Sequence, residues 1–353
     1  MSVPGYLSRF FGGKPRVNLW RRFERMRESV SGTMSKFYKV REIATGEVRG
    51  LKIIDRKKSD PFEGRYRGLN KPSEGEIGSR IGGPNIAKTL EWGQSVDGES
   101  FIVMEFITGT LLHTVLSTGE PFPPAQRLDL VRQAATAIAA VHNAGFIHRD
   151  ICPRNLMLCP DGRLVLFDFG LSVPDKPAFL RPGNRIGTPS YMAPEVVRRR
   201  PIARQLDMFS FGVTAYELCT LDMPWPRVPG GKAALRHDTT PRDIREFWPD
   251  MPPPLAAAIM SCIAAEPEQR PASMEKFLSR ISAVSLGCGP AKPHGESFLT
   301  APMASRPRLA GKGLKPGRAV FNLWGFSRRA RRPPPCRFDC RPRVAVREKD
   351  PRR

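Results

Sequence analysis

The sequence predicts an α+β fold of two lobes, a small strand-rich lobe followed by a larger helical one. Short β-type runs separated by turn sequences dominate before residue 107, whereas apolar residues recur at helical spacing after residue 124. At 353 residues the chain is long enough for both lobes and for flanking segments. We expect a flexible basic and aromatic leader, a small lobe, a large lobe and a disordered basic tail, at residues 1–29, 30–108, 109–284 and 285–353.

Three runs account for the strands of the small lobe. Residues 36–40 and 48–54 are rich in β-forming side chains and flank the turn sequence ATGE at residues 44–47. Residues 101–106 follow a second turn signal, Asp97-Gly98. These runs predict adjacent strands of one sheet.

The large lobe is predicted from helical periodicity. Leu128, Val131, Ala135 and Ile138 lie on one face of a predicted helix that ends before Gly145. A short buried strand at residues 164–167 follows an Asp-Gly turn. Further helices are predicted at residues 206–220, 255–265 and 273–284.

Positive charge is concentrated at the two ends of the chain. The formal charge is +23, and residues 285–353 alone hold 17 basic and four acidic residues. This tail is too rich in Pro, Gly and Arg to bury a core. The leader mixes arginines with aromatic residues, a composition of either a disordered segment or a basic amphipathic helix on a membrane. Both ends would attract polyanions, either an anionic membrane surface or nucleic acid.

Seven cysteines occur without a Cys-x-x-Cys pair, which argues against a disulfide framework and a zinc ribbon. The sequence also lacks an apolar run of about 18 residues and a signal-peptide core near residue 1. We therefore expect a cytoplasmic protein in a reducing compartment.

The segment FIHRDICPRN at residues 146–155 lies between the predicted helix and the buried strand. It resembles the catalytic loop of the protein kinase family. The resemblance implies that Asp150 accepts the proton of the substrate hydroxyl and that Asn155 binds Mg²⁺. The family fold is a bilobal protein-kinase-like fold, which agrees with the predicted lobes.

Two further motifs extend the resemblance from about residue 30 to residue 284. Asp168-Phe169-Gly170 is similar to the family's metal-binding triplet, so Asp168 would bind Mg²⁺ beside the phosphates of ATP. The segment GTPSYMAPE at residues 187–195 resembles the docking loop for protein substrates, and its Thr188 follows the serine/threonine pattern. Glu195 would pair with Arg270, and Asp207 would anchor the catalytic loop.

The nucleotide site is also assigned by resemblance. Lys52 would bind the α- and β-phosphates of ATP and pair with Glu74, or with Glu76 as the alternate. The residues implied to contact the rest of the nucleotide are Gly32, Met104, Glu105, Ile107 and Met157.

Several positions depart from the family pattern. The loop over the phosphates keeps one glycine of three, Gly32, while Phe37 replaces a valine and Gly50 replaces a small apolar residue, so the adenine pocket is reshaped. Cys152 stands where serine/threonine kinases have lysine, and Arg154 is the candidate substitute. The helix that carries Glu74 contains three glycines, at 75, 78 and 82, which predict a short or mobile helix ordered by nucleotide or a partner.

Arg149 in this family usually meets a phosphate on the activation segment. Between Asp168 and Gly187 the single hydroxyl residue is Ser172, and Asp175 is a candidate acidic replacement for the phosphate. The sequence therefore predicts activity without phosphorylation of this segment.

Three alternatives to an active protein kinase follow from the same observations. The altered glycine loop and Cys152 are compatible with a pseudokinase that acts as a scaffold. A kinase-like enzyme for small molecules is disfavoured by the docking loop. The basic tail could instead carry the main function, by binding nucleic acid or anionic lipid.

Overall fold

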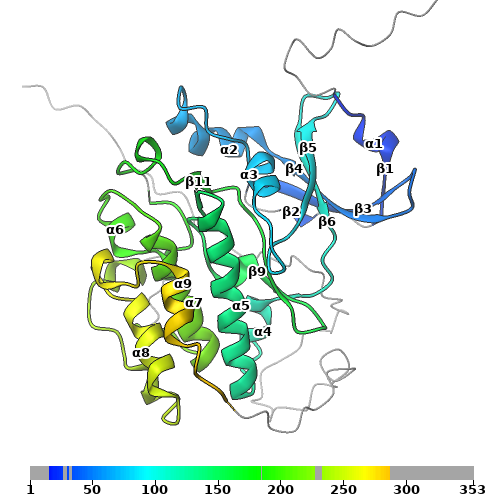
Figure 1. Ribbon diagram of the computed structural model, residues 1–353. Coiled ribbons are helices and arrows are strands. Elements are labelled where there is room, and N and C mark those ends of the chain that lie inside the picture. The colour runs from blue at the N-terminus through cyan, green and yellow to red at the C-terminus, as the bar shows by residue number, and fades with distance from the viewer. Residues whose placement is uncertain (1–15, 27–29, 32–33, 184, 227–232, 287–353) are drawn as a thin grey trace, which may run out of the picture.

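The computed structural model describes residues 16–26, 30–31, 34–183, 185–226 and 233–286. It has the expected two lobes, a twisted β-sheet flanked by short helices and a larger helical body (Figure 1). The predicted α+β, bilobal class is therefore confirmed. The predicted tail lies almost wholly outside the described residues.

The elements of the small lobe are α1 (Leu19–Arg22), β1 (Phe23–Arg25), β2 (Val30–Ser31), β3 (Ser35–Glu42), β4 (Val48–Ile54), α2 (Arg56–Glu63), η2 (Gly64–Tyr66), α3 (Glu74–Arg80), β5 (Thr89–Gln94) and β6 (Ser100–Glu105).

The large lobe contains β7 (Thr110–Leu111), α4 (Leu112–Leu116), α5 (Pro124–Asn143), β8 (Phe146–Ile147), η3 (Pro153–Asn155), β9 (Leu156–Leu158), β10 (Leu164–Leu166), β11 (Val173–Pro174), η4 (Pro177–Phe179), η5 (Pro189–Tyr191), α6 (Pro194–Val197), α7 (Gln205–Thr220), η6 (Ala233–Arg236), η7 (Ile244–Glu246), α8 (Pro253–Cys262), η8 (Pro267–Gln269) and α9 (Met274–Arg280).

The sheet of the small lobe is antiparallel in the order β1-β3-β4-β6-β5, with β2 paired to the other end of β3. Leu51 and Ile53 on β4 are buried in the sheet's core with Val40. Because side chains alternate along a strand, Lys52 between them points to the opposite face, toward the large lobe.

The small lobe begins before residue 30, where the sequence placed its boundary. β1 pairs with β3 from Phe23↔Glu42 to Arg25↔Val40, and Asn18 caps α1 by accepting a hydrogen bond from the Arg21 amide. Leu19 and Phe23 are buried against the sheet. The prediction of a flexible leader is therefore wrong for residues 16–26, because two apolar side chains anchor this basic segment.

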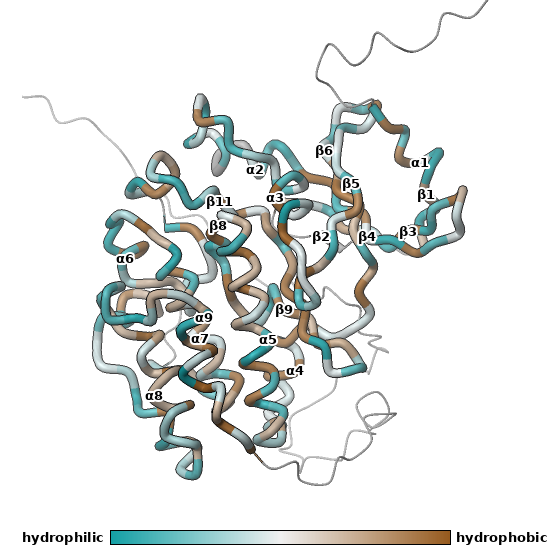
Figure 2. The backbone as a smooth tube through the Cα atoms, in the orientation of Figure 1, coloured by the Kyte–Doolittle hydropathy of each residue, from teal (hydrophilic) through white to brown (hydrophobic). Residues whose placement is uncertain are grey.

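The large lobe is built around α5 and α7, which pack side by side (Figure 1). Ten residues of α5 are buried, including Leu128, Val131, Ala135 and Ile138 from the predicted face. In Figure 2 the hydrophobic stretches run along the central helices and strands, while many outer loops are hydrophilic. Among the described residues, no helix has both the length and the hydrophobicity needed to cross a bilayer.

The helix α3 is only seven residues long, and its glycines have a packing role. A Cβ on Gly75 would lie 2.3 Å from the Cβ of Trp92, and one on Gly78 would lie 2.5 Å from Thr89 Oγ1. Glycine at these positions lets α3 approach β5 closely, which offsets part of its low helix propensity. Gly82 lies beyond the helix end.

Candidate active site

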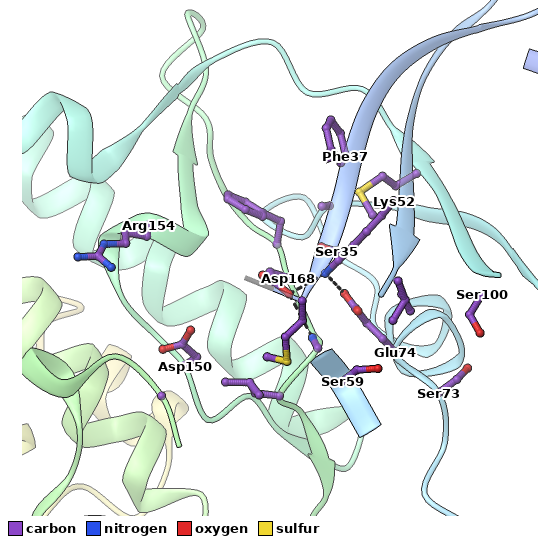
Figure 3. Close-up of a pocket in the computed structure, with 18 of the residues that line it drawn as sticks. Ser35, Phe37, Lys52, Ser59, Ser73, Glu74, Ser100, Asp150, Arg154 and Asp168 are labelled. Carbon is purple, nitrogen blue, oxygen red and sulfur yellow. Dashed lines mark hydrogen bonds and ion pairs between the residues drawn. The ribbon is translucent and has the colours of Figure 1, made fainter. Parts of the chain in front are cut away.

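A cleft of about 1230 Å³ is lined by residues of both lobes. Its walls include Lys52 and Glu74 from the small lobe and Asp150 and Asp168 from the large lobe (Figure 3). The cleft therefore brings together residues that are more than 100 positions apart in the sequence.

Lys52 joins the two lobes through a pair of carboxylates. Its Nζ lies 2.5 Å from Glu74 Oε1 and 2.9 Å from Asp168 Oδ1, and the side chains of Lys52 and Glu74 are each 12% exposed (Figure 3). Of the two glutamates considered from the sequence, Glu74 occupies this position. Glu76 instead accepts a hydrogen bond from Arg80.

Burial and mutual attraction oppose each other in this cluster. Burial lowers the pKa of Lys52, but Asp168 and Glu74 outweigh it, and the net pKa is raised. For Glu74 the net pKa is raised, because burial and the charge of Asp168 together outweigh the attraction of Lys52. For Asp168, burial is outweighed by the charge and hydrogen bond of Lys52, so its net pKa is lowered and its carboxylate is ionised at neutral pH.

The Asp150 carboxylate is held by three donors. The Thr188 amide and Thr188 Oγ1 each lie 2.8 Å from Asp150 Oδ1, and Asn155 Nδ2 lies 3.0 Å from Oδ2. Asn155 Nδ2 also donates to the Asp150 carbonyl at 2.7 Å. Thr188 was used in the sequence only to assign a kinase class, and its bond to Asp150 has no local sequence signal.

The loop rests on a buried aspartate of α7. Asp207 accepts hydrogen bonds from the amides of His148 and Arg149 at 2.7 and 2.8 Å, and lies 3.0 Å from His142 Nε2. Burial raises the pKa of Asp207, but these hydrogen bonds and the nearby histidines lower it by more. The net pKa therefore falls below the ordinary value of an aspartate. The charged form is therefore the one that holds the loop.

The docking-loop motif is fixed by a bidentate ion pair. Arg270 Nη1 and Nη2 lie 2.7 and 2.9 Å from the two carboxylate oxygens of Glu195, and both side chains are buried. The pair ties α6 to the loop after η8, as the resemblance implied.

Position 152 cannot supply a cation. Cys152 is buried with its Sγ 3.5 Å from Thr188 Oγ1, and burial, followed by the charge of Asp150, raises the pKa of this thiol to about 12. Arg154, two residues further along the same loop, is exposed and lines the cleft. Of the two arginines in this loop, Arg154 lines the cleft, whereas Arg149 is buried.

The walls of the cleft include the residues assigned to the adenine site. Met104, Glu105 and Ile107 line it where β6 ends, and the buried Met157 lines it from β9. Phe37 also lines the cleft, and Gly50 on β4 lies behind its ring. Gly32 lies outside the described residues.

One sequence-based suggestion is wrong. Asp175 does not meet Arg149, because it forms an ion pair with Arg204. The Arg149 guanidinium instead donates to the hydroxyl of Tyr66, 2.6 Å away. Tyr66 was not identified from the sequence, since nothing near it marks it as functional.

Asp168, which lines the cleft, and Asn155, which contacts Asp150, carry oxygen atoms that fit a magnesium ion bound together with phosphates. The Asp168 carboxylate and the carboxamide oxygen of Asn155 are hard oxygen donors of the kind that Mg²⁺ prefers. No group of three His, Cys, Asp or Glu side chains among the described residues forms a metal cage. A metal here would therefore take its remaining ligands from substrate phosphates and water.

Two lobes around a cleft, with a Lys–Glu pair on one side and a fixed Asp–Asn loop on the other, define the bilobal kinase class of phosphotransferases. The family profile of the protein kinase domain matches residues 23–280, well over half of the chain. The chain therefore belongs to the protein kinase family.

Curated relatives of this chain include proteins of several bacteria. Serine/threonine-protein kinase pkn3 of Myxococcus xanthus is 30% identical over 291 residues, covering 77% of this chain and 52% of that protein. PknA of Mycobacterium tuberculosis is 28% identical over 284 residues, which cover 78% of this chain and 64% of that protein. PkaA of Streptomyces coelicolor is 32% identical over 251 residues, which cover 69% of this chain and 44% of that protein. This chain thus spans only about half to two thirds of these relatives.

Proposed function

We propose that this chain transfers the γ-phosphate of ATP, with Mg²⁺, to serine or threonine hydroxyls of protein substrates. The observation that carries the proposal is one cleft whose lining holds both Lys52, paired with Glu74 and Asp168, and Asp150. Asn155 fixes Asp150 from behind by a hydrogen bond to its carboxylate. Phosphoryl transfer depends mostly on positioning and on neutralising charge, which fixed oxygens and cations supply.

Each group has a distinct role in this mechanism. Lys52 holds the α- and β-phosphates, and Glu74 keeps its ammonium in place. Asp150 orients the substrate hydroxyl and accepts its proton, while Thr188 and Asn155 fix the orientation of the carboxylate. Mg²⁺, when bound by Asp168 and Asn155, would neutralise charge on the phosphate oxygens.

The adenine end of the site is assigned to the wall of the cleft where β6 ends. Backbone groups of Glu105 and Ile107 would meet the base, with Met104 behind it and Met157 beneath it. Arg154 would stabilise the transferred phosphate in place of the absent lysine at position 152. Gly32, outside the described residues, remains a proposed phosphate contact from the sequence.

A pseudokinase scaffold is the alternative. It is disfavoured because the Lys52 and Asp150 arrangements are complete and because Phe37 and Gly50 are complementary in size. The test is thermal stabilisation by ATP with and without Mg²⁺, followed by phosphate transfer to a serine/threonine protein substrate. Asp168→Asn should lose the Mg²⁺-dependent increment, and a wild-type chain that binds ATP but transfers no phosphate would favour the scaffold.

The basic tail carries a separate proposal, binding to an anionic membrane surface or to nucleic acid. Support comes from the charge of residues 285–353 alone. Deleting these residues should remove salt-dependent binding to anionic vesicles or to nucleic acid and leave kinase activity intact. A reducing, cytoplasmic setting suits the buried free thiols at positions 152, 159, 219 and 262.

A further inference from the structure

Arg149 is a buried cation next to the proposed catalytic base. The residue is 8% exposed, and its backbone amide is held by Asp207. Among the described residues no carboxylate forms an ion pair with its guanidinium, whose side-chain partner is the Tyr66 hydroxyl at 2.6 Å. A guanidinium enclosed in this way needs a fixed acceptor, because an unsatisfied buried charge is costly.

The activation segment does not offer a phosphate to fill that need. Ser172, its one hydroxyl residue before Thr188, is completely buried, and its Oγ lies 3.5 Å from the His148 carbonyl. A protein kinase could not reach this hydroxyl without opening the fold. Asp175 is already paired with Arg204.

Tyr66 is itself fixed from three sides. Its ring centroid lies 5.7 Å from that of Phe179, in the activation segment, and 5.7 Å from the ammonium of Lys71. Lys71 is buried and lies 2.6 Å from Glu63, at the end of α2. Tyr66 is 6% exposed, so its hydroxyl is presented to Arg149 from a packed position.

Tyr66 also lies in η2, only a few residues before Ser73, the N-cap of α3. The segment that holds Arg149 is therefore the segment that leads into the helix carrying Glu74. If α3 moved away from Lys52 and drew η2 with it, Arg149 would lose its acceptor inside the protein. The two contacts, Lys52–Glu74 and Arg149–Tyr66, should thus form and break together.

We propose that Tyr66 is a positioning residue that takes the place of an activation-segment phosphate at Arg149 and couples the position of α3 to the catalytic loop. This inference rests on the proposed kinase function. It assigns the neutral hydroxyl of a small-lobe residue to a contact that the family usually makes with a phosphate. The kinase would then be competent without any phosphorylation between residues 168 and 188.

The test uses the full chain, produced with a co-expressed phosphatase and checked by mass spectrometry for absence of phosphate at residues 168–188. Tyr66→Phe keeps the ring and removes the hydroxyl. We expect its kcat to fall about tenfold and its KM for ATP to rise, because the loosened α3 carries Glu74, the partner of Lys52. Tyr216→Phe is the matched control, because the Tyr216 hydroxyl is buried without a hydrogen-bond partner among the described residues.

A double-mutant cycle separates positioning from packing. In an Arg149→Leu background, Tyr66→Phe should change kcat by less than twofold, because the acceptor no longer has a donor. A Tyr66→Phe enzyme with kcat within twofold of wild type would overturn the proposal. So would an equal loss in both backgrounds, which would show that Tyr66 acts independently of Arg149.

Hydrogen exchange gives a readout that does not require activity. Tyr66→Phe should increase exchange in residues 148–155 and 74–80 together, with α8 unchanged, and unchanged exchange in those two segments would also overturn the coupling. If the proposed kinase function itself is wrong, the activity measurements give a different result. Wild type and Asp150→Asn would then be equally inactive, while the exchange experiment would still decide the role of Tyr66.

Discussion

The ring of Phe37 fills the space that a side chain at position 50 would occupy. A Cβ built on Gly50 would lie 2.8 Å from Phe37 Cζ, closer than real Cβ atoms approach, and 3.0 Å from Met104 Cγ, a tight contact. The sequence showed two separate departures from the family pattern at positions 37 and 50. In the structure the two departures compensate each other in size, because the larger Phe37 on β3 fills the space left by the smaller Gly50 on β4.

Gly50→Ala should therefore weaken ATP binding by about tenfold, roughly 1.4 kcal/mol, within the usual range for overpacking. The added methyl group would push Phe37 into the nucleotide site. Titration of the purified variant with ATP measures the effect. Phe37→Val in the same chain should restore affinity to within about threefold, because it removes the obstructing ring. Equal losses in the single and double variants would show that the two positions are not coupled.

Asp150→Asn should lower kcat at least about 100-fold, because an amide cannot accept the proton of the substrate hydroxyl. ATP binding should persist, since Lys52 and Asp168 are untouched. Steady-state phosphate transfer and ATP-induced thermal stabilisation measure the two properties separately. Asp97→Asn, in an exposed turn, is the control for loss of a carboxylate. Full activity of Asp150→Asn would contradict its assignment as the base.

Arg154→Ala should lower kcat by about 10- to 100-fold, whereas Cys152→Ala should stay within about threefold of wild type. A thiol whose pKa is about 12 is neutral at physiological pH and cannot stabilise phosphate charge. Arg154 carries a guanidinium, a good phosphate ligand, and lines the cleft. Phosphate-transfer rates at saturating ATP measure the difference. Small and equal effects would refute the substitution of Arg154 for the family lysine.

The residues proposed for catalysis could be located in the sequence because they lie in contiguous motifs. The segments at residues 146–155 and 168–170 carry their own spacing, and helical periodicity located α5 and α7. Contacts made across long sequence separations were not predictable. Tyr66 contacts Arg149 across 83 residues of sequence, and Gly75 on α3 is required by Trp92 on β5. The segment at residues 16–26 was predicted to be flexible because of its many arginines. Composition gave no sign that two of its apolar side chains, Leu19 and Phe23, are buried against the sheet.

Gly75→Ala should destabilise the protein, although alanine favours a helix by up to about 1 kcal/mol. The new Cβ would lie 2.3 Å from Trp92 Cβ, an atom fixed to the β5 backbone, so α3 must move away from the sheet. Overpacking of this kind typically costs about 1–3 kcal/mol, more than the propensity gain.

Gly82→Ala is the matched control, because a Cβ there meets nothing within 4 Å. Urea denaturation of both variants measures the difference in the free energy of unfolding.

Displacement of α3 should also weaken the Lys52–Glu74 pair, so Gly75→Ala should bind ATP less tightly and show faster hydrogen exchange in residues 72–82. In the wild type, addition of ATP should slow that exchange if nucleotide orders the helix, and uniform protection without ligand would contradict a mobile α3. A Gly75→Ala chain as stable as Gly82→Ala would show that close packing on Trp92 is not what requires glycine.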